Sequence, residues 1–263
     1  MSEGRIALTI VIPTLNEAGQ IGELVRSLDW ASEVIVSDGG SSDETVPIAA
    51  HAGALVLEST GSTIAAQRNA AISVAVNEWV FALDADERVS ASLRSELPRV
   101  LAAPEYQAYR VRRQNFYLGR ELRRGHWGRD WVTRLFTRDQ RYEERRVHEG
   151  LEKVVEPGRL EGCLTHIPYR DLSHQLEKME RYAKWGAMDL RERGKRASIW
   201  DLSTRPFGRF LRAYLLQGNA VDGRFGLTTS MLGAYGTFLK YAHLWALERE
   251  TPDPRPASTS VRG

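Results

Sequence analysis

The chain has 263 residues, 42% hydrophobic and 27% charged, the composition of an ordinary folded protein with room for one large domain and an appendage. Its formal net charge is only +2, so the overall charge points to no acidic partner. The single cysteine, Cys163, excludes a disulfide framework and favours a reducing compartment. Residues 225–239, the longest uncharged stretch, are too few to cross a bilayer, and residues 6–12 are too few for a signal peptide. We therefore expect a cytoplasmic protein without a transmembrane helix.

The first hundred residues alternate short apolar runs with amphipathic stretches. These patterns predict strands at 7–12, 33–38, 54–57 and 79–83 and helices at 16–28, 41–51, 62–76 and 93–101. Candidate helix caps are Asn16, a Ser41–Glu44 box, Ser62 or Thr63, and Ser90 or Ser92. The alternation predicts an α/β fold with a mainly parallel, Rossmann-like sheet joined by right-handed crossovers.

The alternation ends after residue 101. Strands are expected at 108–113 and 131–137, and apolar stripes from residue 173 to about 250 predict helices. The last residues combine three prolines with small polar residues, which predicts disorder. We expect a sheet domain over 1–170, a helical region over 171–250 and a disordered tail over 251–263.

The apolar run at 80–83 ends in the acidic segment Asp84-Ala-Asp-Glu87. A buried strand explains the run, but no fold requires two carboxylates at the end of a strand. Ligands of open α/β sheets bind outside the carboxyl ends of the strands. Asp84 and Asp86 there suit a divalent cation that shares its oxygen ligands with a diphosphate. The alternative is a polar turn after the strand.

Polar residues also follow the other strands. They are Pro13, Thr14, Glu17, Asp38 and, on the helix before the fourth strand, Arg68. Because the carboxyl ends of parallel strands share one edge, we expect these residues to converge with the acidic pair. Asp38 can bind a uracil imide or a ribose hydroxyl, and Arg68 can meet a phosphate. The alternatives are turn or cap roles for Asp38 and Asp43, and a surface position for Arg68.

Residues 109–146 are rich in arginine. They contain twelve Arg, no Lys and five acids, a local net charge of +7. Arg in preference to Lys favours bidentate recognition of phosphate or carboxylate groups. The alternative is a solvated charged surface.

Several motifs resemble known enzymes. Three motifs resemble family 2 glycosyltransferases of the GT-A fold: Val11-Ile-Pro-Thr-Leu-Asn-Glu17, Val36-Ser-Asp-Gly-Gly-Ser-Ser-Asp-Glu-Thr45 and Leu83-Asp-Ala-Asp-Glu87. Four further motifs are similar to the bacterial lipopolysaccharide-core β-1,4-glucosyltransferase subgroup: Arg113-Gln-Asn-Phe-Tyr-Leu-Gly-Arg120, Arg134-Leu-Phe136, Val147-His-Glu149 and Tyr235-Gly-Thr-Phe-Leu-Lys-Tyr241. The resemblance covers residues 6 to 248.

The resemblance implies an inverting transfer from a nucleotide-sugar donor, UDP-glucose first, with Mg²⁺ or Mn²⁺ as cofactor. By resemblance, the residues around the nucleotide are Pro13, Thr14, Glu17, Asp38 and Arg68. Asp84 matches the ribose- or metal-side acid and Asp86 the metal ligand. The chain lacks the Gln-x-x-Arg-Trp motif of many family members and has Trp131-Val-Thr-Arg-Leu135 instead, so addition of a single sugar is expected.

An inverting transfer needs a base that takes the proton of the acceptor hydroxyl. Glu149 is the first candidate and Glu87 the second. His148 is a candidate for a further metal or phosphate contact, and a surface His-Glu pair is the alternative. Arg113 and Arg134 are expected to contact an acceptor that bears phosphates or acidic sugars, such as a lipopolysaccharide-core or other envelope glycolipid.

The helical region adds a membrane hypothesis. Its arginines Arg205, Arg209 and Arg212 are interleaved with large apolar residues. A basic amphipathic helix of this kind can lie on an anionic membrane, here the cytosolic face of the inner membrane. The alternatives are packing on the catalytic domain and a homodimer interface.

Other classes of protein remain open from the residues alone. A sugar nucleotidyltransferase shares the sheet architecture, but its Gly-rich basic loop is replaced here by Pro13-Thr-Leu-Asn-Glu17. A non-catalytic nucleotide-sugar or membrane-binding module is disfavoured by the acids Asp84, Asp86 and Glu149. Nucleic acid is not expected as a partner, because the basic segment contains no recognisable binding module.

Overall fold

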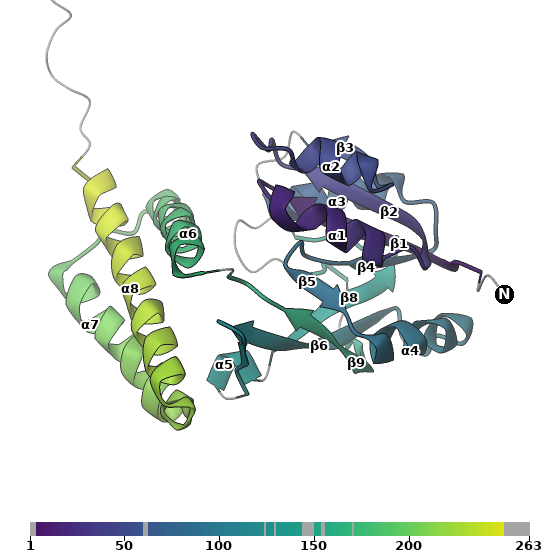
Figure 1. Ribbon diagram of the computed structural model, residues 1–263. Coiled ribbons are helices and arrows are strands. Elements are labelled where there is room, and N and C mark those ends of the chain that lie inside the picture. The colour runs from purple at the N-terminus through teal and green to yellow at the C-terminus, as the bar shows by residue number, and fades with distance from the viewer. Residues whose placement is uncertain are drawn as a thin grey trace, which may run out of the picture. The chain divides into compact units, whose positions relative to one another are not determined.

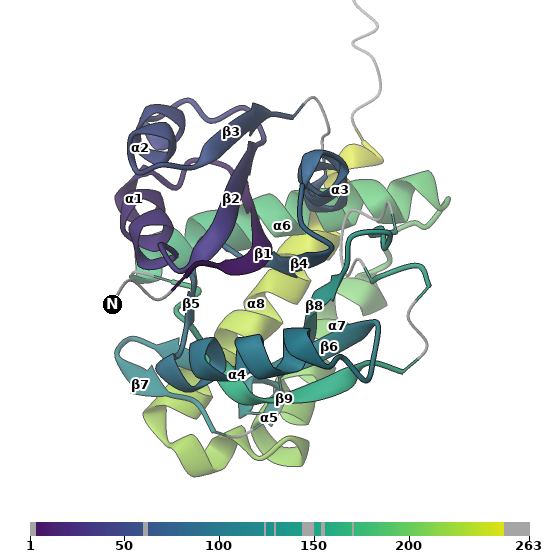
Figure 2. The same cartoon turned by 90° about the vertical axis from the view of Figure 1, so that its right-hand side faces the viewer.

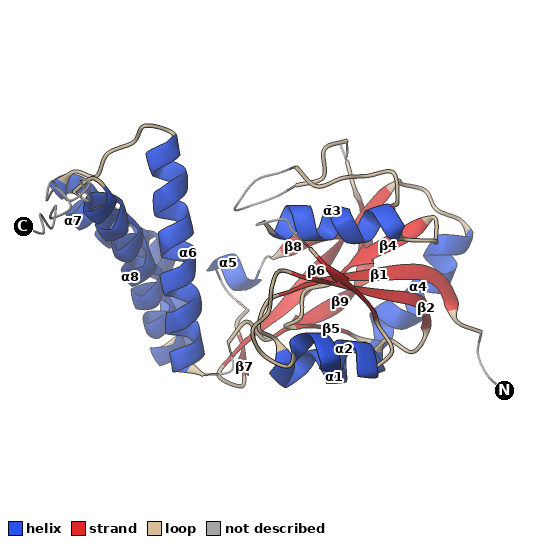
Figure 3. Cartoon of the chain, turned by 90° about the horizontal axis from the view of Figure 1, so that it is seen from above, coloured by secondary structure: helices blue, strands red, loops and turns tan. Residues whose placement is uncertain are grey.

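The computed structural model of the chain describes residues 4–59, 63–123, 125–128, 130–143, 150–153, 156–169 and 171–249. The chain divides into two compact units, unit 1 (Met1–Arg170) and unit 2 (Asp171–Gly263) (Figure 1). In the described residues, unit 1 contains all the strands and unit 2 contains only helices (Figure 3).

The first half of unit 1 alternates strands and helices, as predicted. The strands are β1 (Ile6–Thr14), β2 (Ala31–Asp38), β3 (Leu55–Glu58) and β4 (Trp79–Ala82), and the helices are α1 (Ala18–Ser27), α2 (Thr45–His51) and α3 (Ile64–Val74). The strands pair in parallel in the order β3-β2-β1-β4, with Thr14 opposite Asp38 and Val11 opposite Ala82. The carboxyl ends of β1, β2 and β4 therefore share one edge of the sheet.

The second half of unit 1 makes the sheet mixed. Its elements are β5 (Glu87–Val89), α4 (Ala91–Ala102), β6 (Ala108–Tyr117), β7 (Arg120–Glu121), α5 (Gly125–Gly128), β8 (Trp131–Thr137) and β9 (Gly158–His166). Antiparallel β8 joins β4 to β6, and β9 runs parallel to β6 and antiparallel to β5 (Figure 2). The sequence predicted β6 and β8 but not β5, β7 or β9. Because Glu87 on β5 pairs with His166 on β9, the end of β9 lies beside the acidic segment.

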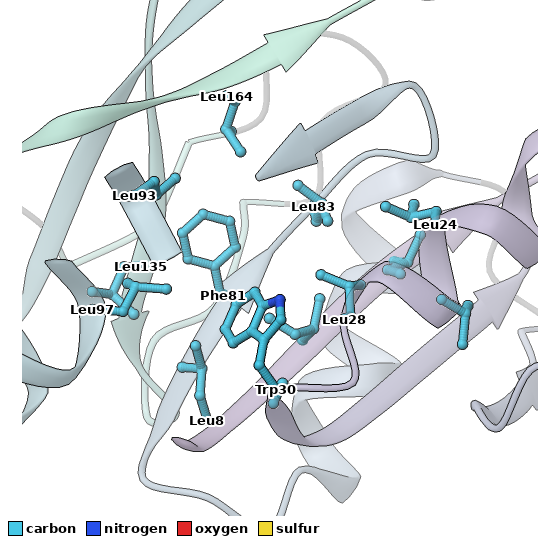
Figure 4. Close-up of a cluster of buried hydrophobic side chains, with 14 of the residues drawn as sticks. Leu8, Leu24, Leu28, Trp30, Phe81, Leu83, Leu93, Leu97, Leu135 and Leu164 are labelled. Carbon is cyan, nitrogen blue, oxygen red and sulfur yellow. The ribbon is translucent and has the colours of Figure 1, made fainter. Parts of the chain in front are cut away.

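Helices cover both faces of this sheet (Figure 3). On one face, Leu24 of α1 and Leu97 of α4 belong to the same buried cluster as Phe81 of β4 (Figure 4). On the other face, Ile72 of α3 packs in a second cluster with Val80 of β4. Strand β4 is therefore buried on both sides, which explains its continuous apolar sequence and makes the acids that follow it conspicuous.

The helix starts show which polar residues act as caps. The side chains of Thr63 and Ser90 accept backbone hydrogen bonds at the starts of α3 and α4, which confirms two predicted caps. The predictions for Asn16 and for the Ser41–Glu44 box were wrong, because α1 and α2 have no side-chain cap. Asn16 instead has a left-handed backbone (φ 58°), and its Oδ1 accepts a hydrogen bond of 2.9 Å from the Ser42 amide. The loops after β1 and β2 are thereby bound to each other.

Over residues 171–249, unit 2 contains three long helices and two short turns. They are α6 (Leu172–Glu192), α7 (Ile199–Leu211), the π-helical turn η1 (Arg212–Leu216), the 3₁₀ turn η2 (Asn219–Asp222) and α8 (Arg224–Leu247). Its small core contains Ala187, Tyr241 and Leu244. Helix α7 has no buried residue, and its Trp200 and Phe207 are 71% and 63% exposed. Within the described ranges, no helix has both the length and the apolar character needed to span a bilayer.

Candidate active site

The acidic segment forms a closed turn at the end of β4. The Glu87 amide donates to the Asp84 carbonyl at 3.0 Å, and the Asp84 amide donates to the Glu87 Oε2 atom at 3.0 Å. Backbone and side chain therefore both close the turn, and Asp86 lies within it. The turn holds Asp86 at the carboxyl end of β4, beside the end of β9.

Two arginines bind the carboxylate of Asp84. Arg68 from α3 donates to Oδ1 at 2.5 Å, and Arg134 from β8 donates to Oδ2. Burial alone would raise the pKa of Asp84, but the nearby guanidinium groups of Arg134 and Arg68 outweigh it and hold that pKa well below its ordinary value. Asp84 therefore stays ionised, and its side chain remains 27% exposed at the edge of the sheet.

The carboxylate of Glu87 lies fully inside the protein. It accepts from Arg134 at 2.7 Å and from Arg113 at 3.4 Å, and Arg113 in turn contacts Asp130 through Nε at 2.8 Å. A buried carboxylate that already accepts hydrogen bonds from two arginines and an amide is poorly placed to take a proton from an acceptor hydroxyl. The same network removes the basis for the acceptor-binding prediction at Arg134, which is only 4% exposed.

A histidine that the sequence did not single out faces Asp86. His166 Nδ1 lies 2.5 Å from Asn115 Oδ1, and His166 Nε2 lies 3.5 Å from Asp86 Oδ1. The amide nitrogen of Asn115 donates to the Trp127 carbonyl and to Asp130, so its oxygen is the atom that faces His166. Nδ1 is therefore the protonated ring nitrogen, and in the neutral ring Nε2 turns its lone pair toward Asp86.

This pair of side chains fits a divalent cation. A lone pair opposite a carboxylate oxygen is an arrangement that a shared cation stabilises, and a carbonyl oxygen that accepts from the other ring nitrogen is typical of histidine ligands. In the described residues, no group of three or more His, Cys, Asp and Glu side chains could hold a metal by itself. Asp86 and His166 would therefore leave coordination positions for ligand oxygens and water.

Asp38 holds the turn after β2. Its carboxylate accepts from the amides of Gly40 and Ser41 at 2.9 and 2.7 Å and from the Thr14 hydroxyl at 3.2 Å, and it is 2% exposed. A Cβ on Gly39 would lie 2.2 Å from the side chain of Gln67, so α3 is the element that packs closely against this glycine. The turn role is therefore the one that the geometry supports for the Asp38 carboxylate.

Pro13 and Glu17 flank the same edge after β1. Both are half-buried. The Glu17 amide donates to the Thr45 hydroxyl at 2.7 Å, and its carboxylate accepts from Gln20 at 2.6 Å. The loops after β1 and β2 thus form one connected rim next to the Asp84 turn.

Most of the predicted site residues lie along one edge of the sheet. The structure joins Thr14 to Asp38 and joins Arg68, Arg113 and Arg134 to the acidic turn through hydrogen bonds. His148 and Glu149 lie outside the described residues. The sequence missed His166, although the alternation of buried and exposed residues along 158–166 was a readable signal for the strand that carries it.

The fold and this edge define the class of the protein. A largely parallel sheet flanked by helices, with an Asp-x-Asp turn at its carboxyl edge, is the GT-A architecture of glycosyltransferases. A family model described as "Glycosyl transferase family 2" matches residues 9–154. The chain belongs to this family and is a glycosyltransferase, which decides against a sugar nucleotidyltransferase.

Relatives are similar over almost the whole chain. The chain is 30% identical over 261 residues to "Lipopolysaccharide core biosynthesis glycosyltransferase LpsC" of Rhizobium meliloti (strain 1021), covering 96% of each protein. It is 28% identical to "Uncharacterized glycosyltransferase RP128" of Rickettsia prowazekii (strain Madrid E), covering 90% of this chain and 86% of the relative. Among solved structures, S. aureus TarS 1-349 in complex with UDP-GlcNAc has a TM-score of 0.48 and 15% identity, covering 89% of this chain and 80% of that one.

Proposed function

We propose that this enzyme transfers a hexose, with glucose as the first candidate, from a UDP-linked donor to a lipopolysaccharide-core or other cell-envelope glycan or glycolipid. The family membership and the similarity to LpsC along both whole chains support this proposal. The observation that carries it is the pair of Asp86 and His166 at the edge where β1, β2 and β4 end.

Asp86 and His166 are the proposed ligands of a divalent cation, Mg²⁺ or Mn²⁺. When bound, such a cation supplies positive charge for a leaving diphosphate. The mixed oxygen and nitrogen ligands favour Mn²⁺, because Mg²⁺ prefers oxygen ligands alone. Asp84 supports the site by remaining ionised between Arg68 and Arg134.

The rim formed by the loops after β1 and β2 is the proposed wall of the nucleotide site. Pro13, Thr14 and Glu17 contribute the first loop, and Asp38 shapes the second by accepting the amides of Gly40 and Ser41. In this proposal Asp38 acts mainly through the backbone that it orders.

Glu149 remains the proposed base for the acceptor hydroxyl, since the burial of Glu87 argues against the second candidate. Replacing Glu149 by Gln should lower kcat by about 10²–10⁴-fold and leave donor binding intact. The matched comparison is Glu87→Gln, for which we expect reduced thermal stability. A large loss of kcat in a folded Glu87→Gln enzyme, with a small loss in Glu149→Gln, would transfer the role to Glu87.

The proposed acceptor contact is Arg113, which keeps 19% of its side chain exposed while it binds Asp130 and Glu87. Because the proposed acceptors include membrane glycolipids, we also propose that the enzyme works as a peripheral protein on the cytosolic face of the inner membrane. The exposed apolar side chains of α7 support contact with the membrane–water interface.

A donor screen tests the proposal. The enzyme is incubated with UDP-glucose, UDP-galactose, UDP-GlcNAc or GDP-mannose and Mn²⁺, with and without a lipopolysaccharide-core acceptor, and nucleotide release is followed. We expect the fastest release from UDP-glucose with acceptor, and a β-linked product by NMR. Equal release from GDP-mannose would contradict the donor assignment, and an α-linked product would contradict inversion.

A further inference from the structure

Unit 2 contains a cavity between α7 and α8 that is lined mainly by cations. Its volume is about 310 Å³, and the residues that line it include Arg205, Arg209, Arg212, Thr237, Lys240 and Tyr241. Arg205 and Arg209 belong to α7, and Arg212 is the first residue of η1. The other three residues belong to α8. The two helices lie side by side in both Figure 1 and Figure 3. All these residues belong to unit 2, so the cavity is complete within that unit.

Most of this positive charge has no carboxylate partner. Arg205 forms an ion pair with Asp201 one turn earlier in α7. Within the described ranges, no acidic side chain lies within ion-pair distance of Arg209, Arg212 or Lys240. Burial and the neighbouring charge of Arg205 lower the pKa of Lys240, and the carboxylate of Asp189 on α6 opposes this shift only in part.

Packing holds two of the four cations of the cavity in place. The charged groups of Arg205 and Lys240 each lie 5.1 Å from the centre of the Tyr241 ring, which is buried. The stem of Lys240 passes over Gly186 of α6 so closely that a Cβ there would come within 2.9 Å of it. Lys240 is thereby positioned without an ion pair, and Arg209 and Arg212 line the same cavity, so these three cations remain available for an external anion.

We propose that this cavity is a binding pocket for a phosphate ester. Three cations without acidic partners match the charge of a phosphate of about −1 to −2 better than a single carboxylate, and arginine offers the paired donors that phosphate oxygens accept. The volume also leaves room for the first atoms of the alcohol that carries the phosphate. The ligand can come from the headgroup of an anionic lipid or from a soluble phosphate ester.

The exposed surface of α7 and η1 favours a lipid headgroup as the source of the phosphate ester. On α7 and η1, Trp200, Phe207 and Leu216 are 71%, 63% and 84% exposed, so the segment that carries the arginines also offers apolar groups to an interface. The choice of a lipid source rests on the membrane association proposed above. The phosphate site itself does not depend on that association or on the transfer reaction.

The test compares two double variants of the full-length enzyme with equal loss of charge. Arg209→Gln with Arg212→Gln removes two cations of the pocket, and Arg191→Gln with Arg196→Gln removes two exposed cations of unit 2 that do not line it. Each protein is titrated with glycerol 3-phosphate by calorimetry and is sedimented with vesicles of phosphatidylcholine, with or without phosphatidylglycerol. Thermal midpoints establish that the variants are folded, and nucleotide release from the donor establishes that the catalytic site is unchanged.

We expect the wild type to bind phosphatidylglycerol vesicles and the pocket variant to bind about tenfold more weakly than the control variant. Arg209→Lys with Arg212→Lys should lose part of the affinity, because the charge is kept while the paired donors are removed. Binding of glycerol 3-phosphate without a preference for phosphatidylglycerol would keep the pocket and assign it to a soluble ester. Equal losses in the two Gln variants, or no binding of either probe by the wild type, would overturn the proposal.

Discussion

The carboxylate of Glu87 is the structural centre of the acidic turn, and its burial argues against a role as the base. It joins Arg134, Arg113 and the amide of Asp84, and it thereby connects strands that are distant in sequence. The sequence places Glu87 next to two acids and so suggests shared chemistry. The burial of Glu87 is the observation that distinguishes it, as a residue that binds arginines, from Asp86, the proposed metal ligand.

Removing this carboxylate should destabilise the fold. Glu87→Ala leaves the buried charge of Arg134 with one partner fewer, and breaking such a pair typically costs about 3–5 kcal/mol. The free energy of unfolding in urea measures the loss. Glu78→Ala, at an exposed acid in the loop before β4, should change it by less than about 0.5 kcal/mol. Similar effects of the two substitutions would show that the network contributes little.

The contact between Asn115 and His166 should tune metal binding. Asn115→Leu keeps the branched skeleton of a fully buried side chain, with somewhat larger end groups, but removes the oxygen that orients the His166 ring. Loss of a hydrogen-bond partner that orients a metal ligand typically lowers metal affinity by about 10–100-fold. Titration of Mn²⁺ followed by electron paramagnetic resonance measures the affinity. Gln114→Leu is the neighbouring control, and an equal affinity in both variants would contradict the assignment of His166 as a ligand.

The ion pairs of Asp84 predict a defined pH dependence of stability. Because the pKa of Asp84 in the folded protein is held far below its ordinary value of 3.8, the ionised form stabilises the fold at all pH values above that ordinary pKa. The stabilisation is lost as the pH falls from there toward the folded pKa. We expect wild type to exceed Asp84→Asn by a nearly constant unfolding free energy above about pH 5, and the difference to shrink below about pH 4. A difference that shrinks between neutrality and pH 5 would contradict this account.

At the scale of elements, the sequence patterns predicted the individual helices and parallel strands better than the pairing of the later strands and the contacts between loops. The helices and the four parallel strands follow from the apolar periodicity, because each buries one face or both faces in the sheet. Strand β9 was missed because its partners β5 and β6 are far away in sequence, although its alternating pattern is typical of a strand. The caps predicted at Asn16 and Ser41 are absent, because the side chains of both residues bind the opposite loop instead.

The contact of α4 with β9 should be sensitive to a single methyl group. A Cβ on Gly162 would lie 2.4 Å from the Leu93 Cα, and backbone at that distance must move. Gly162→Ala should therefore cost about 1–3 kcal/mol and loosen the strand that carries His166. Gly4→Ala is the control, because nothing lies within 4 Å of its Cβ. Equal thermal midpoints for the two variants would show that α4 and β9 separate without cost.

At the scale of the whole molecule, the order of elements predicted the α/β class and the edge where the site lies. The parallel pairing of the strands brings Thr14, Asp38 and Asp84 to the same edge of the sheet, independently of the contacts that their side chains make. The roles of Arg134 and His166 could not be predicted in the same way. They depend on antiparallel strands that return from the second half of the unit, and on burial that a local pattern does not reveal.

The central claim is that the edge carrying Asp86 and His166 binds a nucleotide diphosphate together with a divalent cation. Calorimetric titration of UDP into the wild type and into Asp86→Asn, each with Mn²⁺ and with a chelator, tests it most directly. The account predicts binding to the wild type that requires Mn²⁺, and a loss of about 10–100-fold or more in the variant. UDP binding of equal strength in the chelator, or in Asp86→Asn, would contradict it.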